Sequence, residues 1–221
     1  MRHSFSTMRH RLLSFVLLAG ATASLGLASA PVHAAPTVRL AGNVTVVALS
    51  QDFAGALGAL GLTANSLGLS ALVDGRAYFP ISSGAIDAAT ARGEINHFGG
   101  LRLSTNSIRV ELSDFAIDTT GTPKLTGLVV ANGDVVGRIP LFSLALPSLT
   151  LPLTPNGRSV RIPSVGVALT AEAAQALNAT FGVSAFVAGF NIGTAEVRAI
   201  IRRNASVGHL HVPRGRDAMD D

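Results

Sequence analysis

The feature that most constrains the fold is a repeated alternation of apolar and polar residues in short segments. Residues 94–103 and 108–117 alternate in this way. Successive side chains of a β-strand point to opposite faces, so a period of two is typical of strands with one buried face. After a further apolar run at 125–131, Asn132-Gly133 is a strong signal for a two-residue β-hairpin. The sequence predicts a mainly β fold, either an antiparallel sandwich or a barrel-like sheet.

One of these segments contains a break in the alternation. Within residues 110–117, apolar residues occupy even positions up to Leu112 and odd positions from Phe115. A regular strand cannot change the face of its apolar side chains without an extra residue. We therefore predict a β-bulge at Ser113 or Asp114.

Two segments have the periodicity of helices instead. Residues 50–60 carry apolar side chains at i, i+3, i+4 and i+7, and residues 170–181 do so with the last one a position late. Ser50 and Thr170 precede these runs, and hydroxyl side chains are favoured at the N-cap. The pattern predicts two short amphipathic helices.

The two helices belong to longer segments that resemble each other. Residues 47–57 align without gaps with residues 167–177, and each segment is followed by a glycine and a further strand-like run, at 75–81 and 193–201. We interpret this order as an internal repeat. It predicts two equivalent helices that each cover part of a shared sheet.

The N-terminus has the three parts of a secretory signal peptide. Arg2, Arg9 and Arg11 precede an apolar run at 12–30, and small residues precede a cleavage site after Ala34. The alternative is a membrane anchor, because 19 residues are just enough to span a bilayer. The second half of the run is mostly Ala, Gly and Ser, which favours cleavage.

We therefore expect a signal peptide at 1–34, a single β-rich domain at 35–205 and a flexible C-terminal tail at 206–221. Such a chain would be extracytoplasmic, either secreted or held in the periplasm or cell envelope. We expect no transmembrane anchor after processing.

Charge and composition exclude several classes of function. The expected signal peptide removes three of the 17 basic residues and none of the 13 acidic ones, which leaves 14 against 13. A nearly neutral domain gives no support to nucleic-acid binding, and we expect no nucleic-acid partner. The chain has no cysteine, which excludes a cysteine nucleophile, an iron–sulfur cluster and a thiolate zinc site.

The sequence also lacks motifs for catalysis. It contains no Gly-x-Ser-x-Gly, no phosphate-binding loop and no His-Glu-x-x-His. Outside the expected signal peptide the histidines are His97, His209 and His211. The last two could supply half of a metal site, but no third ligand is evident and the tail is expected to be flexible. We predict that the protein is not an enzyme and has no metal site.

Tyr78 and His97 form the candidate cofactor-binding pair. If the strands at 76–81 and 94–103 pair symmetrically about residues 87–88, Tyr78 faces His97 across the ladder. A tyrosine with a basic partner can serve as an axial ligand of haem iron. The alternative is an ordinary cross-strand contact that stabilises the sheet.

The order of these motifs resembles a known family. A helix begins with Ser50-Gln51-Asp52-Phe53, a strand runs into Tyr78-Phe79-Pro80-Ile81-Ser82-Ser83-Gly84, and segments 93–101 and 112–117 follow. This is similar to the HtaA-type domain of secreted bacterial haem-uptake proteins and their uncharacterised exported relatives. The resemblance covers roughly residues 45–145. It implies a β-rich, sandwich-like domain with a short helix near a ligand cleft.

One departure from the family concerns the iron ligand. In haem-binding members of the family, a tyrosine shortly after the residue that corresponds to Phe53 supplies that ligand. Here residues 54–57 are Ala, Gly, Ala and Leu. Tyr78 would then be a relocated ligand.

Two functions remain open from the sequence. The first is an exported, non-catalytic β-domain that acts as a binding or structural module in the envelope or outside the cell, with an envelope protein as partner and no cofactor. The alternative is an HtaA-like binder of haem or another small hydrophobic ligand that uses Tyr78 and His97.

Overall fold

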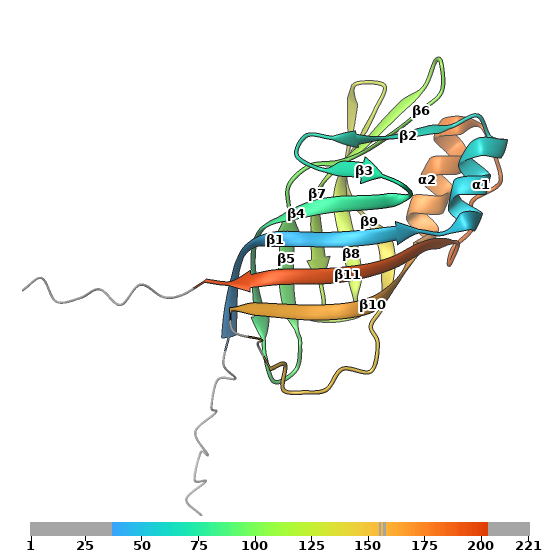
Figure 1. Cartoon of the computed structure of the whole chain (residues 1–221). Coiled ribbons are helices and arrows are strands. Elements are labelled where there is room, and N and C mark those ends of the chain that lie inside the picture. The colour runs from blue at the N-terminus through green and yellow to red at the C-terminus, as the bar shows by residue number, and fades with distance from the viewer. Residues whose placement is uncertain (1–36, 155, 157, 203–221) are drawn as a thin grey trace, which may run out of the picture. The chain divides into compact units, whose positions relative to one another are not determined.

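The computed structural model describes residues 37–154, 156 and 158–202, and within them the fold is mainly β, as predicted (Figure 1). The expected signal peptide and C-terminal tail lie outside the described residues. The strands are β1 (Thr37–Leu49), β2 (Thr63–Leu67), β3 (Ala71–Val73), β4 (Arg76–Asp87), β5 (Gly93–His97), β6 (Gly100–Ser104), β7 (Arg109–Asp118), β8 (Lys124–Ala131), β9 (Asp134–Ala145), β10 (Ser159–Leu169) and β11 (Asn191–Ile201). The helices are α1 (Gln51–Ala59) and α2 (Ala171–Phe181).

The sheet closes into a barrel. Eight strands follow one another in the order β7-β5-β4-β1-β11-β10-β9-β8, and β8 pairs back onto β7. All of these pairings are antiparallel. Of the two predicted architectures, the barrel is therefore the one observed. β6 continues along β7 beyond β5, β2 adds to β6, and β3 adds to β4, so the extra strands extend one end of the barrel.

The predicted bulge is confirmed in β7. Regular pairing with β8 stops at Ser113 and resumes at Ala116, so that Asp114 and Phe115 together lie opposite Gly127. Asp114 has a φ of 51°, in the left-handed region. The extra residue allows Phe115 to point into the barrel, as do the apolar residues earlier in the strand.

The predicted hairpin is also confirmed. Asn132 and Gly133 join β8 to β9, and their φ values are 54° and 96°. Both positions of a type I′ turn need a positive φ, which is why the Asn-Gly dipeptide identified this turn from sequence alone.

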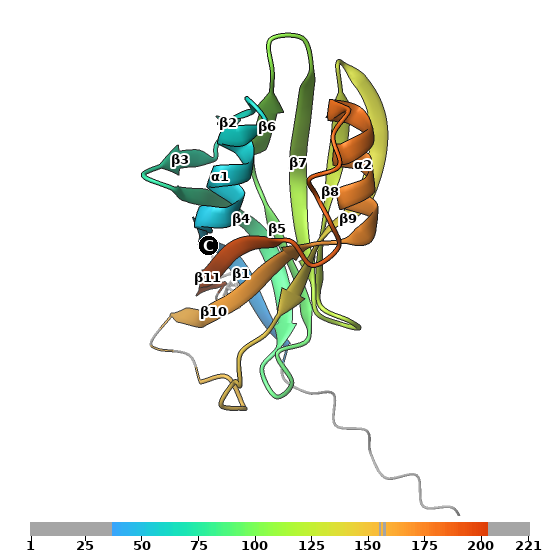
Figure 2. The ribbon, with the colours of Figure 1, turned by 90° about the vertical axis from the view of Figure 1, so that its right-hand side faces the viewer.

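Both predicted helices are present, and each begins at the expected hydroxyl cap. Ser50 Oγ accepts a hydrogen bond from the Phe53 backbone amide, and Thr170 Oγ1 accepts one from Ala173, each at 3.0 Å. The two helices lie at the same end of the barrel, α1 near β2 and β4 and α2 near β8 and β9 (Figures 1 and 2). α1 follows β1, and the later strand β4 pairs with β1. In the same way, α2 follows β10, and β11 pairs with β10. That the two units are copies of one repeat stays a prediction.

The core fills the barrel and continues under the helices. Phe79 and Phe115 pack edge to face inside the barrel, with their ring centroids 5.1 Å apart. Phe53 from α1 and Leu177 from α2 are buried in the same cluster. Among the described residues, no helix has the length and apolarity needed to cross a membrane.

Candidate functional site

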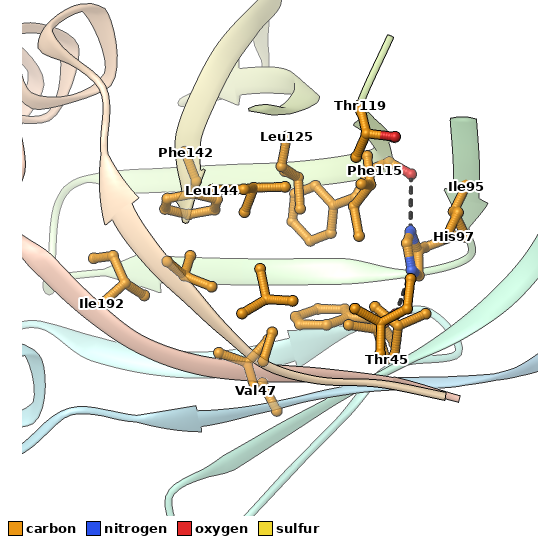
Figure 3. Close-up of a pocket in the computed structure, with 18 of the residues that line it drawn as sticks. Thr45, Val47, Ile95, His97, Phe115, Thr119, Leu125, Phe142, Leu144 and Ile192 are labelled. Carbon is orange, nitrogen blue, oxygen red and sulfur yellow. Dashed lines mark hydrogen bonds between the residues drawn. The ribbon is translucent and has the colours of Figure 1, made fainter. Parts of the chain in front are cut away.

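His97 lies inside the barrel at the end of β5 and is 5% exposed (Figure 3). Its Nδ1 is 3.3 Å from the backbone oxygen of Phe115, and its Nε2 is 2.8 Å from Oγ1 of Thr45. A carbonyl oxygen only accepts hydrogen bonds, so Nδ1 carries the proton and donates it to Phe115. The Thr45 hydroxyl then donates to Nε2. Both ring nitrogens of His97 are therefore engaged in hydrogen bonds within the protein.

The environment of His97 keeps the imidazole neutral. Burial lowers the pKa of His97 from 6.5 to about 4, against a smaller opposing effect of the hydrogen bond to the Phe115 carbonyl. A buried imidazolium would lose its hydration without gaining a charged partner, so the neutral form is favoured. His97 is thus a satisfied polar residue within an apolar core.

The space around His97 is small. The barrel interior leaves a cavity of about 60 Å³, and a second cavity of about 50 Å³ lies under the helices. Leu101, Phe142 and Ile192 line both cavities and lie between them. A cavity of about 150 Å³ is known to hold benzene, and a porphyrin is several times larger. Neither cavity can hold haem in this conformation.

Tyr78 lies on the other face of the sheet. Its neighbours in β4, Ala77 and Phe79, are buried inside the barrel, so Tyr78 points outward. It pairs with Val46 on β1 and with Ala71 on β3.

The predicted pairing of Tyr78 with His97 is wrong, because His97 lies opposite Ile81. The strand expected at residues 76–81 is longer than predicted, because β4 continues to Asp87. The true turn follows Asp87, whose carboxylate accepts a hydrogen bond from the Ala89 backbone amide at 2.7 Å. This moves the centre of the hairpin along the chain.

The two candidate residues therefore do not form one site. A bulge between Ile81 and Ser83 shifts the register of β4 against β5 and also changes which side chains of β4 face inward. Tyr78 precedes this bulge on the outer face, whereas His97 is buried inside. Whether either residue contacts a cofactor stays a prediction.

Tyr78 has apolar neighbours on the outer face, together with the exposed Arg76 two residues before it in β4. Phe98 is 51% exposed and its backbone amide donates to the Pro80 carbonyl at 2.9 Å, which places it beside the strand of Tyr78. Val73 is 53% exposed at the end of β3. We refer to this surface as the outer apolar patch; its members are Val46, Ala71, Val73, Tyr78, Pro80 and Phe98.

A charged cluster borders the patch on β10 and β11. The Glu196 carboxylate accepts hydrogen bonds from Nε of Arg161 at 2.5 Å and from Nε of Arg198 at 2.6 Å. These hydrogen bonds, first that of Arg161 and then that of Arg198, lower the pKa of Glu196 to about 2. The hydrogen bond to Glu196, followed by the negative charge of that carboxylate, raises the pKa of Arg198.

This cluster was missed in the sequence, although part of its signal was visible. Glu196 and Arg198 are two residues apart on the predicted last strand and therefore share a face. Arg161 lies in a proline-interrupted segment, so its partner depends on a register that the sequence does not reveal. Within the described part of the chain, no group of three His, Asp or Glu side chains is placed to hold a metal ion.

Comparison with known proteins shows which solved structures have a similar fold. No family model matches the sequence, and no curated protein is detectably similar to it. The C-terminal domain of HtaA from Corynebacterium glutamicum superposes with a TM-score of 0.56 at 17% identity, over 75% of this chain and 99% of that domain. The N-terminal domain of HtaA gives a TM-score of 0.55 at 15% identity, over 74% and 99%.

A third structure, the heme-binding protein HtaB from the same organism, gives 0.47 at 9% identity over 76% of this chain and 96% of HtaB. That score is too low to bear on fold or function. The two HtaA domains confirm, at the level of fold, the resemblance identified in the sequence. This chain has the fold of the HtaA domains.

Proposed function

We propose that the chain is an exported, non-catalytic binding module that binds haem or another flat hydrophobic anion on the outer face of its barrel. The shared HtaA fold and the sequence resemblance to secreted haem-uptake proteins support a binding role. The observation that carries the proposal is the position of Tyr78, the only tyrosine of the chain, within the outer apolar patch.

The outer face suits haem better than the interior does. Cavities of about 60 and 50 Å³ exclude a porphyrin, and both nitrogens of His97 are bonded. On the outer face, the Tyr78 phenol offers an oxygen ligand of a kind that haem iron takes in proteins. Phe98 and Pro80 offer apolar contacts for the ring. In this proposal Tyr78 is the iron ligand and His97 has a structural role.

The test is a titration of the mature chain with ferric haem, followed by its Soret absorption. The wild type should shift the Soret band, and Tyr78→Phe should lose the spectrum of an oxygen-ligated iron. His97→Gln should bind as the wild type does, because its side chain does not reach the outer face. No spectral change of the wild type at micromolar haem would refute the proposal. Equal spectra of Tyr78→Phe and wild type would refute the role of Tyr78.

The filled interior favours a second function, a structural module of the cell envelope. A domain that only supports other envelope proteins needs no ligand space, and the two cavities are too small for a ligand of ordinary size. Failure of the wild type to bind haem or metal-free porphyrin, with a folded domain, would support this function over the first.

A further inference from the structure

We infer that Arg161 and Arg198, held by Glu196, form the anion-binding subsite of the outer face and bind the carboxylates of the ligand. This inference rests on the proposed function, because it takes the outer apolar patch as the binding surface. It adds the part of the site that would distinguish an anionic ligand from a neutral one.

The sheet register places the cluster on the same face as Tyr78, with Glu196 two strands away. Val46 pairs with Tyr78 on one side and with Glu196 on the other, so these two residues flank it on the outer face. Adjacent strands are about 4.8 Å apart, which puts their backbones roughly 10 Å from each other. The strands that carry these residues, β4, β1, β11 and β10, lie next to one another in Figure 1.

The cluster has an excess of positive charge. Arg161 lies directly opposite Arg198 across the ladder, a placement in which two cations repel each other. One carboxylate, that of Glu196, bonds to both. Two guanidinium groups against one carboxylate leave a net charge of about +1 beside the patch.

The bonds within the cluster leave its cations available. Glu196 bonds the Nε atoms of both arginines, and among the described residues the terminal nitrogens of these two side chains have no hydrogen-bond partner. The side chains are 65% and 52% exposed. A guanidinium group binds a carboxylate through two parallel N–H donors, and the terminal nitrogens of these exposed side chains can supply such donors.

Another ion pair of the same protein shows the contrast. Arg102 bonds Glu111 through both Nε and a terminal nitrogen, at 3.0 and 2.9 Å. This pair is one to one and its charges cancel. It lies on β6 and β7, away from the strands that carry the cluster. Arg102 therefore serves as the matched control for a change of arginine that leaves the proposed subsite intact.

The ligand should be amphiphilic, with an apolar plane and carboxylates at one edge. Haem and metal-free protoporphyrin carry two propionates at one edge, whereas the dimethyl ester of protoporphyrin presents the same ring without negative charge. The apolar patch would contact the ring and the cluster would bind the carboxylates. A comparison of acid with ester therefore measures the contribution of the subsite alone.

The experiment is a titration of the mature chain with protoporphyrin, with and without iron, and with the dimethyl ester. Arg161→Gln and Arg198→Gln should each weaken binding of the acid about tenfold and leave binding of the ester unchanged. Arg102→Gln should leave both unchanged. Urea unfolding midpoints equal to that of the wild type would show that the variants are folded.

The outcomes separate the two proposals. Haem binding by the wild type that is indifferent to both arginine substitutions would overturn the subsite and leave the proposed function intact. Arginine-dependent binding of metal-free protoporphyrin, together with haem spectra that are equal in Tyr78→Phe and the wild type, would support the subsite and refute iron ligation by Tyr78. Equal affinities for acid and ester in the wild type would also overturn the subsite.

Discussion

Acid should destabilise the domain through His97, and the size of the effect can be worked out from its surroundings. The pKa of His97 is about 4 in the folded state, because the imidazole is buried, and 6.5 is its ordinary value. Between these values the unfolded chain binds one proton more than the folded chain. The free energy of unfolding therefore falls as the pH is lowered through this window. At about 1.4 kcal/mol per pKa unit, the total loss is about 3 kcal/mol.

The assay is urea unfolding at a series of pH values from 7 to 4, followed by far-ultraviolet circular dichroism because the chain has no tryptophan. His97→Gln keeps a polar side chain near Thr45 and cannot titrate. Glu196 and Asp118, whose pKa values are lowered by their partners, are present in both proteins, and their effect cancels in the comparison. The wild type should lose about 3 kcal/mol more than the variant between pH 6.5 and 4.

Parallel pH profiles of the two proteins would refute this reasoning, because they would mean that His97 takes up its proton equally in both states. A direct measurement keeps the prediction testable if the variant folds poorly. The ring proton resonances of His97 in the wild type, followed by NMR, should titrate with a pKa well below 6.5. Titration near 6.5 in the folded protein would show that the imidazole is not held neutral by burial.

Three further predictions concern the fold and the export signal. Gly127→Ala should cost about 1–3 kcal/mol, since an added Cβ would lie 2.6 Å from the buried side chain of Leu141 and 2.9 Å from that of Phe115. Gly121→Ala, with open space around it, should be neutral in the same urea assay. Loss of the helix caps in Ser50→Ala or Thr170→Ala should cost about 1 kcal/mol each, and an unchanged unfolding midpoint would contradict the role of the hydroxyl groups. Sequencing of the exported protein should show a cut after Ala34, and a full-length chain in the membrane fraction would contradict cleavage.

Local sequence signals predicted the parts of the fold that depend on neighbouring residues. The Asn132-Gly133 turn follows from the need for positive φ, and the cap at Ser50 follows from its hydroxyl. The bulge at Asp114 follows from a change in the face of apolar residues within one strand. The alternation did not decide between a sandwich and a barrel, because strands of both have it, and closure depends on the pairing of β8 back onto β7.

The error at Tyr78 and His97 shows why the site was harder to predict than the fold. Gly84 lies within β4, beyond the expected end of the strand at Ile81, and an added Cβ there would come 2.8 Å from the backbone oxygen of Glu94. The glycine is required by the close approach of two strands.

A change in the face of the apolar residues, the signal that predicted the bulge in β7, is also present in β4. In β4, buried side chains occupy odd positions up to Ile81 and the even position Ile86, which indicates an extra residue between them. One undetected bulge assigns every later side chain of the strand to the wrong face of the sheet. To predict which residues of two strands face each other, every bulge between them must be known. The bulge in β4 places Tyr78 and His97 on opposite faces of the sheet, and the ligand site proposed at Tyr78 therefore lies outside the barrel.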